Sequence, residues 1–452
     1  MITGPVFRIA VTVLALTVLG PAVLAGCSQP QPRTHGHERV ATPTAGPSTA
    51  GAATSVAAPA VVTCSPYPVA PDLGEGPVPR VPYTSVRLHG VFDIEDYTDR
   101  LCALSENRLD KRPTEAVWLL RLADGKLKKV VSRPVNRGFN ILGLKASDRW
   151  LAWEEVSPGD DLVFACTWKV YAARIDRPTL TLSQRRLVDS GATESPSGSA
   201  APGQATAIPF DDAGRPLYKS RPLFVLVDDR LLWITDLGTQ AHATGELRSV
   251  DLRSGERRLM YTAPQGSFLG TIGAATGSVW VTEPAHDGYR VRVAVFNTLT
   301  GERVGTFDLD NRTAQLTHFP SLHAGFVAWA VMPTPENAGQ SALYLRDPDG
   351  VVHRIPGDAN NQHFAGRFFF YGADAQKGVP GAIRDLSEVW GVDLRDLTSF
   401  RLAGSNVDTG GSWSVGMNVN YTRHVFLAAK SLLGIYPGAR SRVTILRVYR
   451  LD

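Results

Sequence analysis

The sequence predicts an all-β fold, a β-propeller, from three observations. Short apolar strands containing an aromatic residue recur along the chain, and the intervals between Trp233, Trp280, Trp329 and Phe370 are 47, 49 and 41 residues. Propeller blades repeat at roughly 40 to 50 residues. Segments of alternating polarity end in tight glycine-containing turns, as β-hairpins do, and long helical patterns are absent. Many short strands favour a sandwich or a propeller, and the common period selects the propeller.

Residues 1–26 are expected to form a signal peptide. Arg8 supplies a positive charge, an apolar run follows from Ile9, and the run ends in Leu24-Ala25-Gly26-Cys27. This ending resembles the lipobox of bacterial lipoproteins, and the resemblance implies that Cys27 is acylated and becomes the first mature residue. The acyl chains would then anchor the exported protein to the membrane, on its extracytoplasmic side.

Two alternatives remain for this segment: an ordinary cleaved signal and a retained transmembrane helix. The apolar run of about 17 residues is at the lower limit for spanning a ~30 Å hydrocarbon core. Gly20-Pro21 also interrupts it, which disfavours a continuous helix.

Residues 27–60 are expected to be the lipidated cysteine and a flexible tether. Ala, Thr, Pro, Ser and Gly dominate this stretch, so it cannot bury enough apolar surface to offset the entropy of ordering. Its mean end-to-end distance would be roughly 30 Å. His35 and His37 form a His-x-His pair, but two histidines without a third ligand do not predict a metal site.

The chain as a whole has the composition of a globular protein, with 43% hydrophobic and 20% charged residues. Its 47 basic and 43 acidic residues give a formal net charge of +4. Because the basic residues are scattered among nearly as many acids, nucleic acid is not expected as a partner.

The propeller domain is expected to span residues 61–452. Seven blades are predicted, with six as the alternative, at 84–134, 138–190, 216–264, 268–310, 315–358, 361–405 and 411–452. A Gly-, Ser-, Ala- and Pro-rich insertion, expected to be disordered, separates the second and third blades at 190–219. Closing the ring removes exposed sheet edges, and a segment within residues 60–92 is expected to supply the outer strand of the last blade.

Hairpins with a polar turn justify the strands inside these blades. They are expected at 117–125, 247–256, 293–302, 343–350 and 389–396, and the last one lacks the turn glycine. The stretch from Asp251 to Leu259 resembles the blades of the TolB-like and quinoprotein-like propeller families. No Trp-Asp dipeptide, as in WD40 blades, accompanies the repeats. The resemblance implies a fold and no particular activity, since propellers serve as enzymes, receptors and scaffolds.

Beyond Cys27 there are three cysteines, Cys64, Cys102 and Cys166. An exported domain can oxidise at most one pair of them. A Cys102–Cys166 disulfide joining adjacent blades is the preferred prediction, and a bond from Cys64 is the alternative. The paired spacing of a metal site is missing.

Two groups of residues are candidates for a binding or catalytic site. Asp93, Glu95, Asp96 and Asp99 form an acidic cluster without the glycine spacing of a calcium loop. His318 and His323 flank the start of the fifth blade and would lie near the channel mouth. We expect a solvated loop and structural histidines respectively. No nucleophile elbow, phosphate loop or zinc-protease motif is present, so no metal or cofactor is predicted and the catalytic residues are unknown.

These observations favour a membrane-anchored envelope protein whose propeller binds another protein or a cell-wall ligand. The alternative is an envelope enzyme, a hydrolase, a lyase or a quinone-dependent dehydrogenase, with its site at the central channel. An enzyme would place charged or histidine residues from several blades around one channel mouth.

Overall fold

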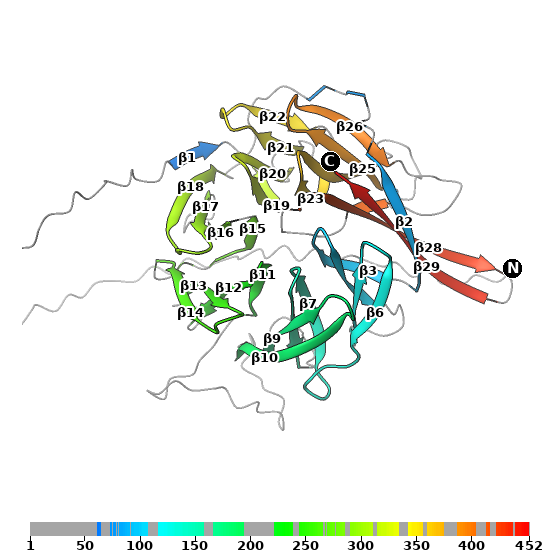
Figure 1. The fold of residues 1–452 in the computed structure, drawn as a ribbon. Helices are drawn as coiled ribbons and strands as arrows, with labels where there is room; N and C mark the ends of the chain where they lie inside the picture. The colour runs from blue at the N-terminus through cyan, green and yellow to red at the C-terminus, as the bar shows by residue number, and fades with distance from the viewer. Residues whose placement is uncertain are drawn as a thin grey trace, which may run out of the picture. The chain divides into compact units, whose positions relative to one another are not determined.

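In a computed structural model, seven sheets follow one another around a ring, six of four strands and one of five, so the chain forms a seven-bladed β-propeller (Figure 1). The described residues span 61–451, with gaps at 65–72, 75, 78, 80, 91, 107–115, 158–165, 194–220, 238–243, 265–266, 268, 276, 285–289, 311–313, 334–341, 356–358, 375–386, 404–412, 416–421 and 437–438. Every element in these ranges is a strand, and within them no helix is long and apolar enough to cross a membrane. The prediction of an all-β propeller with seven blades is confirmed, and the six-bladed alternative is excluded.

Each blade is an antiparallel sheet, and its strands follow one another in order from the centre of the ring to its rim. Blade 1 comprises β3 (Phe92–Tyr97), β4 (Leu101–Glu106), β5 (Val117–Arg121) and β6 (Lys126–Val131). Blade 2 comprises β7 (Asn140–Ala146), β8 (Trp150–Val156), β9 (Thr167–Asp176) and β10 (Thr181–Ala192). Blade 3 comprises β11 (Leu223–Val227), β12 (Arg230–Leu237), β13 (Thr244–Asp251) and β14 (Arg257–Thr262).

The next three blades repeat this order. Blade 4 comprises β15 (Ile272–Ala275), β16 (Ser278–Pro284), β17 (Arg290–Asn297) and β18 (Arg303–Asp310). Blade 5 comprises β19 (Ala314–His323), β20 (Phe326–Pro333), β21 (Ala342–Arg346) and β22 (Val352–Ile355). Blade 6 comprises β23 (Ala359–Ala365), β24 (Phe368–Asp374), β25 (Ser387–Asp393) and β26 (Thr398–Ala403).

Blade 7 joins the two ends of the domain. It comprises β27 (Trp413–Val415), β28 (Val425–Tyr436), β29 (Ala439–Arg450) and, as its outer strand, β2 (Tyr83–His89) from the N-terminal part of the chain. All seven residues of β2 pair with β29, from Tyr83 opposite Tyr449 to His89 opposite Val443. The predicted closure by a segment within residues 60–92 is confirmed. The predicted start of blade 1 at residue 84 is wrong, because that strand belongs to blade 7.

The described residues before β2 contact the outer strands of blades 4, 5 and 6, and we call the described residues within 61–89 the N-terminal strap. Its first strand, β1 (Val61–Cys64), pairs in parallel with β18 as a fifth strand of blade 4. Leu73 N then donates to Arg354 O of blade 5 at 3.0 Å, and Gly76 N donates to Ser399 O of blade 6 at 2.8 Å. Figure 1 shows the described parts of the strap in blue around the outside of these blades.

The core consists of apolar layers between neighbouring blades. Alternate residues of each strand face opposite neighbours: Leu101 and Ala103 of β4 pack against blade 2, whereas Leu104 packs against blade 7. The strap contributes to two of these layers, with Leu73 buried between blades 5 and 6 and Val81 against the layer between blades 6 and 7.

The expected hairpin glycines lie in the turns that join the third and fourth strands of a blade, which we call the third turns. Gly125, Gly255 and Gly301 have φ of +70°, +81° and +76°, the left-handed region that glycine adopts without strain. Blades 2 and 6 place Leu180 and Leu397 at φ +53° and +56° instead. A left-handed non-glycine residue costs roughly 1–2 kcal/mol, and burial of Leu180 in the layer between blades 1 and 2 offsets that cost.

The predicted Cys102–Cys166 disulfide is not formed, and both side chains are buried. The two cysteines do lie in adjacent blades, but Cys102 faces blade 7 and Cys166 faces blade 3. The layer between blades 1 and 2 therefore contains neither sulfur. Cys27 and the side chain of Cys64 lie outside the residues that can be described.

Candidate functional site

A cavity of about 320 Å³ opens at one mouth of the central channel. Its wall is built mainly from the turns that join the innermost strand of a blade to its second strand, which we call the first turns. Blades 1, 2, 3, 4 and 7 all contribute to it, through Tyr97, Thr98, Asp99, Ala146, Ser147, Asp148, Leu226, Val227, Asp228, Ala274, Ala275, Thr422 and Arg423. A ligand in this cavity would therefore contact five of the seven blades.

The first turns of blades 1, 2 and 3 share an Asp-Arg pair where the second strand begins. The pairs are Asp99-Arg100, Asp148-Arg149 and Asp229-Arg230. Each aspartate accepts hydrogen bonds from the blade that precedes it around the ring. The repeat therefore connects blades 7, 1, 2 and 3 at the cavity mouth.

Two of these aspartates line the cavity and are already engaged. Asp99 accepts the backbone N–H groups of His424 at 2.8 Å and Arg423 at 3.3 Å. Asp148 accepts the hydroxyl of Thr98 at 2.7 Å and pairs with Arg100 at 3.4 Å. These contacts hold the carboxylates in place, while each oxygen keeps a second lone pair for a ligand.

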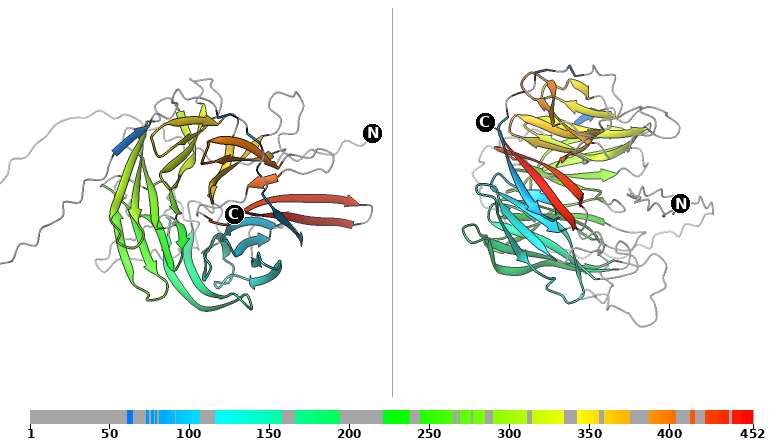
Figure 2. Two further views of the ribbon diagram at one scale, coloured as in Figure 1. Left: turned by 45° about the horizontal axis from the view of Figure 1, so that its top comes forward. Right: turned by 90° about the vertical axis from the view of Figure 1, so that its right-hand side faces the viewer.

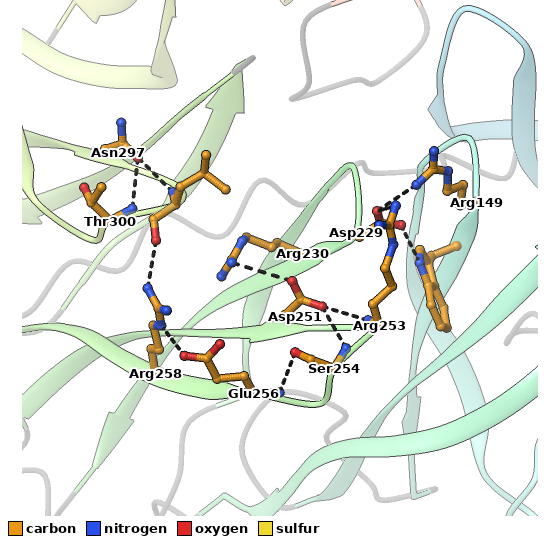
Figure 3. Close-up of polar contacts among 12 residues, drawn as sticks. Arg149, Asp229, Arg230, Asp251, Arg253, Ser254, Glu256, Arg258, Asn297 and Thr300 are labelled. Atoms are coloured by element: carbon orange, nitrogen blue, oxygen red, sulfur yellow. Dashed lines mark hydrogen bonds and ion pairs between the residues drawn. The ribbon is translucent and has the colours of Figure 1, made fainter.

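The third aspartate, Asp229, binds two blades behind the cavity wall (Figure 3). It pairs with Arg149 of blade 2 at 3.0 Å and with Arg253 of its own blade at 2.6 Å, and it accepts Trp150 Nε1–H at 2.9 Å. Charge-assisted hydrogen bonds of this kind are stronger than neutral ones. Asp229 is therefore a structural residue.

The same face carries a second series of contacts, from basic side chains to backbone carbonyls of the next blade's third turn. Arg450 donates to Leu122 O at 3.1 Å, Lys128 to Thr179 O at 3.0 Å and Arg258 to Leu299 O at 2.9 Å. Arg186 donates likewise to Leu252 O. Figure 3 shows the contact of Arg258 with blade 4. These arginine and lysine bridges connect blades 7, 1, 2, 3 and 4 in sequence.

Asp228 and Arg423 are the exposed charged residues of the cavity wall. Asp228 has φ +51°, a conformation in which Asp and Asn are enriched among non-glycine residues. With Asp99 and Asp148, the wall carries three carboxylates and one guanidinium, a formal charge of −2 in a chain of formal charge +4. The cavity therefore favours a cationic group, and the partly exposed Val227 and Ala275 are apolar residues of the same wall.

Behind the wall, burial changes the acidity of two residues of β3. Asp96 is fully buried, and desolvation raises its pKa to about 6, although its carboxylate accepts Ala146 N–H of blade 2 at 2.8 Å. Burial also raises the pKa of the adjacent Glu95, which accepts the Ser105 hydroxyl at 2.5 Å. Both carboxylates therefore form hydrogen bonds with neighbouring strands inside the ring.

The structure separates the predicted acidic cluster. Asp93 is exposed on β3, Glu95 and Asp96 bind neighbouring strands, and Asp99 alone reaches the cavity. The expectation of a single solvated loop is therefore wrong, because three of the four residues lie on β3 and alternate between its faces.

The two predicted histidines lie on β19 of blade 5, whose residues do not line the cavity. His323 packs 5.8 Å from the Phe364 ring of blade 6, and burial lowers its pKa to about 4. This supports a structural role for His323. The side chain of His318 lies outside the described part of the chain.

Sequence reasoning missed Thr98, Asp148, Asp228 and Arg423. The available signal was the Asp-Arg pair before three consecutive second strands, in register with the blade repeat. Among the described residues, no group of three or more His, Cys, Asp or Glu side chains is placed to hold a metal ion.

No protein-family model and no curated protein matches this chain, so the TolB-like and quinoprotein-like resemblance stays a prediction. The fold is similar to that of several solved structures. A prolyl endopeptidase aligns with a TM-score of 0.47 and 14% identity over 80% of this chain and 47% of its own. The polysaccharide lyase Uly1 aligns with a TM-score of 0.47 and 12% identity over 80% and 90%.

The propeller domain of the Trilobed protease from Pyrococcus furiosus, described as having an open velcro topology, aligns with a TM-score of 0.41 and 9% identity over 71% of this chain and 82% of its own. This chain spans about half the length of the prolyl endopeptidase. At these identities the similarities concern the fold alone, and the chain is described as a seven-bladed β-propeller.

Proposed function

We propose that this protein is an exported, lipid-anchored binding protein whose propeller presents the channel-mouth cavity to an extracytoplasmic ligand. The observation that carries this proposal is the cavity wall, which five blades build from turns fixed by hydrogen bonds. Rigid turns present polar groups at fixed positions without an ordering cost on binding. The anchor is supported by the lipobox-like sequence that ends at Cys27.

The ligand class follows from the charge of the wall. A primary ammonium group next to a short aliphatic chain would contact Asp228 and Asp148 with its charge and the partly exposed Val227 and Ala275 with its methylenes. Such groups occur on the lysine side chains of an envelope protein and on amino sugars of a cell-wall polymer. Both sources fit the binding reading.

Titration calorimetry with two defined probes, lysine amide and glucosamine, tests this proposal. The protein used is the full chain carrying Cys27→Ala, so that no acyl chain is attached. We expect saturable binding that Asp228→Asn weakens about tenfold, the loss typical of one charge-assisted hydrogen bond. Asparagine accepts the left-handed backbone of residue 228, so this variant removes the charge and keeps the turn.

Leu259→Ala, at an exposed position of β14, is the matched control and should bind like the parent. Binding that survives Asp228→Asn, or failure of both probes to bind, would contradict the proposed site. Conversion of a bound probe to product would show that the protein is an enzyme and not only a binding protein.

The anchor is tested separately by labelling cells with an alkyne fatty acid. The wild-type chain should incorporate the label and fractionate with membranes, and Cys27→Ala should do neither. An unlabelled wild-type chain recovered in the soluble fraction would leave an ordinary secretion signal as the explanation.

A further inference from the structure

Four arginines gather on the channel-mouth face where blade 2 meets blade 3, and we call them the arginine patch. Blade 2 supplies Arg149, which directly precedes β8, together with Arg174 of β9 and Arg186 of β10, and the third turn of blade 3 supplies Arg253. The two blades pack side by side around the ring (Figures 1 and 2). Three of the arginines are exposed, and Arg186 is half-buried.

Asp229 holds two of these arginines at one point. Arg149 and Arg253 both contact its Oδ2, at 3.0 Å and 2.6 Å (Figure 3). One carboxylate balances one positive charge, so the two guanidinium groups keep a formal charge of +1. Each guanidinium has five N–H donors, and the two side chains are 54% and 64% exposed. They can therefore donate to a further anion without leaving Asp229.

Trp150 connects the other two arginines to this point. Its indole N–H donates to Asp229 at 2.9 Å, and the guanidinium carbon of Arg186 lies 5.1 Å from its ring centre. Arg186 also donates to Leu252 O of blade 3. Arg174 lies directly opposite Trp150 in the register of β8 and β9, so the two side chains share a face of the sheet. A carbonyl and an indole ring orient Arg186 but carry no negative charge to neutralise it.

The patch is therefore strongly positive. Four arginines and Asp229 give a formal charge of +3, in a chain whose formal charge is +4. Two further acids of blade 3 have arginine partners of their own, since Asp251 pairs with Arg230 at 3.6 Å and Glu256 pairs with Arg258 at 2.7 Å. The patch thus has the opposite charge to the cavity wall.

The arginines of blade 2 also follow the order of its strands toward the rim. Arg149 lies at the second strand, Arg174 on the third and Arg186 on the outermost. Neighbouring strands are about 4.7–4.9 Å apart, so these residues cover about 10 Å across the blade. A single small anion cannot contact all of them. The arrangement suits a ligand whose anionic groups repeat along a chain.

We propose that the arginine patch binds a linear polyanion, a chain that bears phosphate or carboxylate groups. Arginine recognises both groups through paired N–H donors. A flat bilayer of anionic lipid fits the patch less well, because the half-buried Arg186 lies against the Trp150 ring and does not protrude. An exported protein would meet such chains among the polymers of the cell wall. The site is separate from the cavity and needs no anchor.

Titration calorimetry with two probes, linear polyphosphate and poly-L-glutamate, tests the proposal on the full chain with Cys27→Ala. We expect saturable binding that weakens in high salt, and binding of one probe alone would identify the anion. Arg149→Gln with Arg253→Gln should weaken binding at least tenfold, through the loss of charge-assisted hydrogen bonds. Arg174→Gln with Arg186→Gln should do the same, because a linear ligand contacts both pairs.

The matched control is Arg292→Gln with Arg401→Gln. It removes the same charge from exposed arginines of blades 4 and 6, which pair with Asp308 and Glu388. This control should change the affinity less than twofold. The dependence of affinity on salt concentration should become shallower in the patch variants and stay the same in the control, because fewer counterions are released when contacts are lost.

Binding of neither probe, or unchanged binding by either pair of patch variants, would overturn the proposal. Equal losses in the patch and control variants would do so as well, since binding would then follow net charge alone. Co-sedimentation with phosphatidylglycerol vesicles that the patch variants lose, without binding of either probe, would assign the patch to a bilayer instead. The cavity is tested with cationic probes, so the two proposals succeed or fail separately.

Discussion

Two parts of the ring are held together by different means. From blade 7 through blades 1, 2 and 3 to blade 4, side chains on the channel-mouth face bridge each pair of blades, as Arg258 does to Leu299 O. Along the rim of blades 4, 5, 6 and 7, the described residues of the N-terminal strap contact each blade in turn. Together the bridges and the strap contact all seven blades.

The side-chain bridges and the strap differ in how many neighbouring contacts one substitution can affect. Each side-chain bridge is local, arises from a turn motif that repeats with the blades and can be lost alone. The strap is a single part of the chain, and its described contacts with blades 4, 5, 6 and 7 follow one another in sequence order. We therefore expect single changes in the bridged part to have small effects and changes in the strap to have large ones.

The largest effect is expected at Leu88 of β2, which is buried between blades 7 and 1 where the two devices meet. Leu88→Asp should lower the free energy of unfolding by about 4 kcal/mol or more, because it places an unpaired charge in an apolar layer. Urea unfolding followed by tryptophan fluorescence measures this. Arg87→Asp, at the exposed neighbouring position, controls for added charge and should change stability by less than about 1 kcal/mol.

The second prediction concerns pH in the bridged part. Asp96 has a pKa raised from 3.8 to about 6, so folding favours its protonated form, and this stabilisation is lost as the pH rises from about 4 through 6. The difference corresponds to about 3 kcal/mol. Asp96→Asn stays neutral, so its stability relative to wild type should increase by about that amount between pH 4 and pH 7.

Urea unfolding of both proteins at the two pH values tests the Asp96 prediction. A constant difference between wild type and Asp96→Asn would show that Asp96 does not titrate in this range.

The third prediction weakens the strap without charge. Leu73→Ala removes a buried side chain from the layer between blades 5 and 6 and should cost about 2–3 kcal/mol. Proteolysis of the N-terminal residues should also become faster, because the rim contacts at Gly74 and Gly76 follow directly. A loss of stability without faster cleavage would indicate that Leu73 acts only as core and does not hold the strap.

The smallest effect is expected from one bridge. Asp229→Ala removes the partner of Arg149 and Trp150 Nε1 and should cost about 1–2 kcal/mol, mainly through the unsatisfied indole N–H. A double-mutant cycle with Arg149→Ala should assign less than about 1 kcal/mol to that exposed pair. A loss of stability as large as that caused by Leu73→Ala would show that the bridged part and the strap do not differ in their sensitivity to single substitutions.

The sequence was sufficient for features that repeat with the blade period. Aromatic spacing predicted the blades, and the turn glycines predicted hairpins whose left-handed φ values are confirmed at Gly125, Gly255 and Gly301. Leu180 and Leu397 occupy the same conformation, yet no local signal marks them, because tertiary burial compensates for the backbone cost.

Features that join distant segments were harder to predict. Because the last blade lacked an outer strand, the sequence predicted that a segment such as β2 would supply it. Nothing in residues 61–82 predicted contacts with three other blades, because these contacts use backbone groups that every residue has. The disulfide prediction placed Cys102 and Cys166 in the correct blades and failed on which face of each strand carries the sulfur. The cavity was not predicted because Asp228 and Arg423 converge only when the ring closes.

The closure of blade 7 also sets the order in which the molecule can be assembled. Tyr83 is synthesised long before Tyr449, its partner in the sheet. A chain emerging from the ribosome therefore exposes β2 long before the strand with which it pairs. Ring closure therefore waits for the C-terminal hairpin, so a chain that stops before β29 cannot place β2 and leaves the first and last blades as open edges. The last step of folding, the pairing of β2 with β29, therefore cannot begin until synthesis is nearly complete.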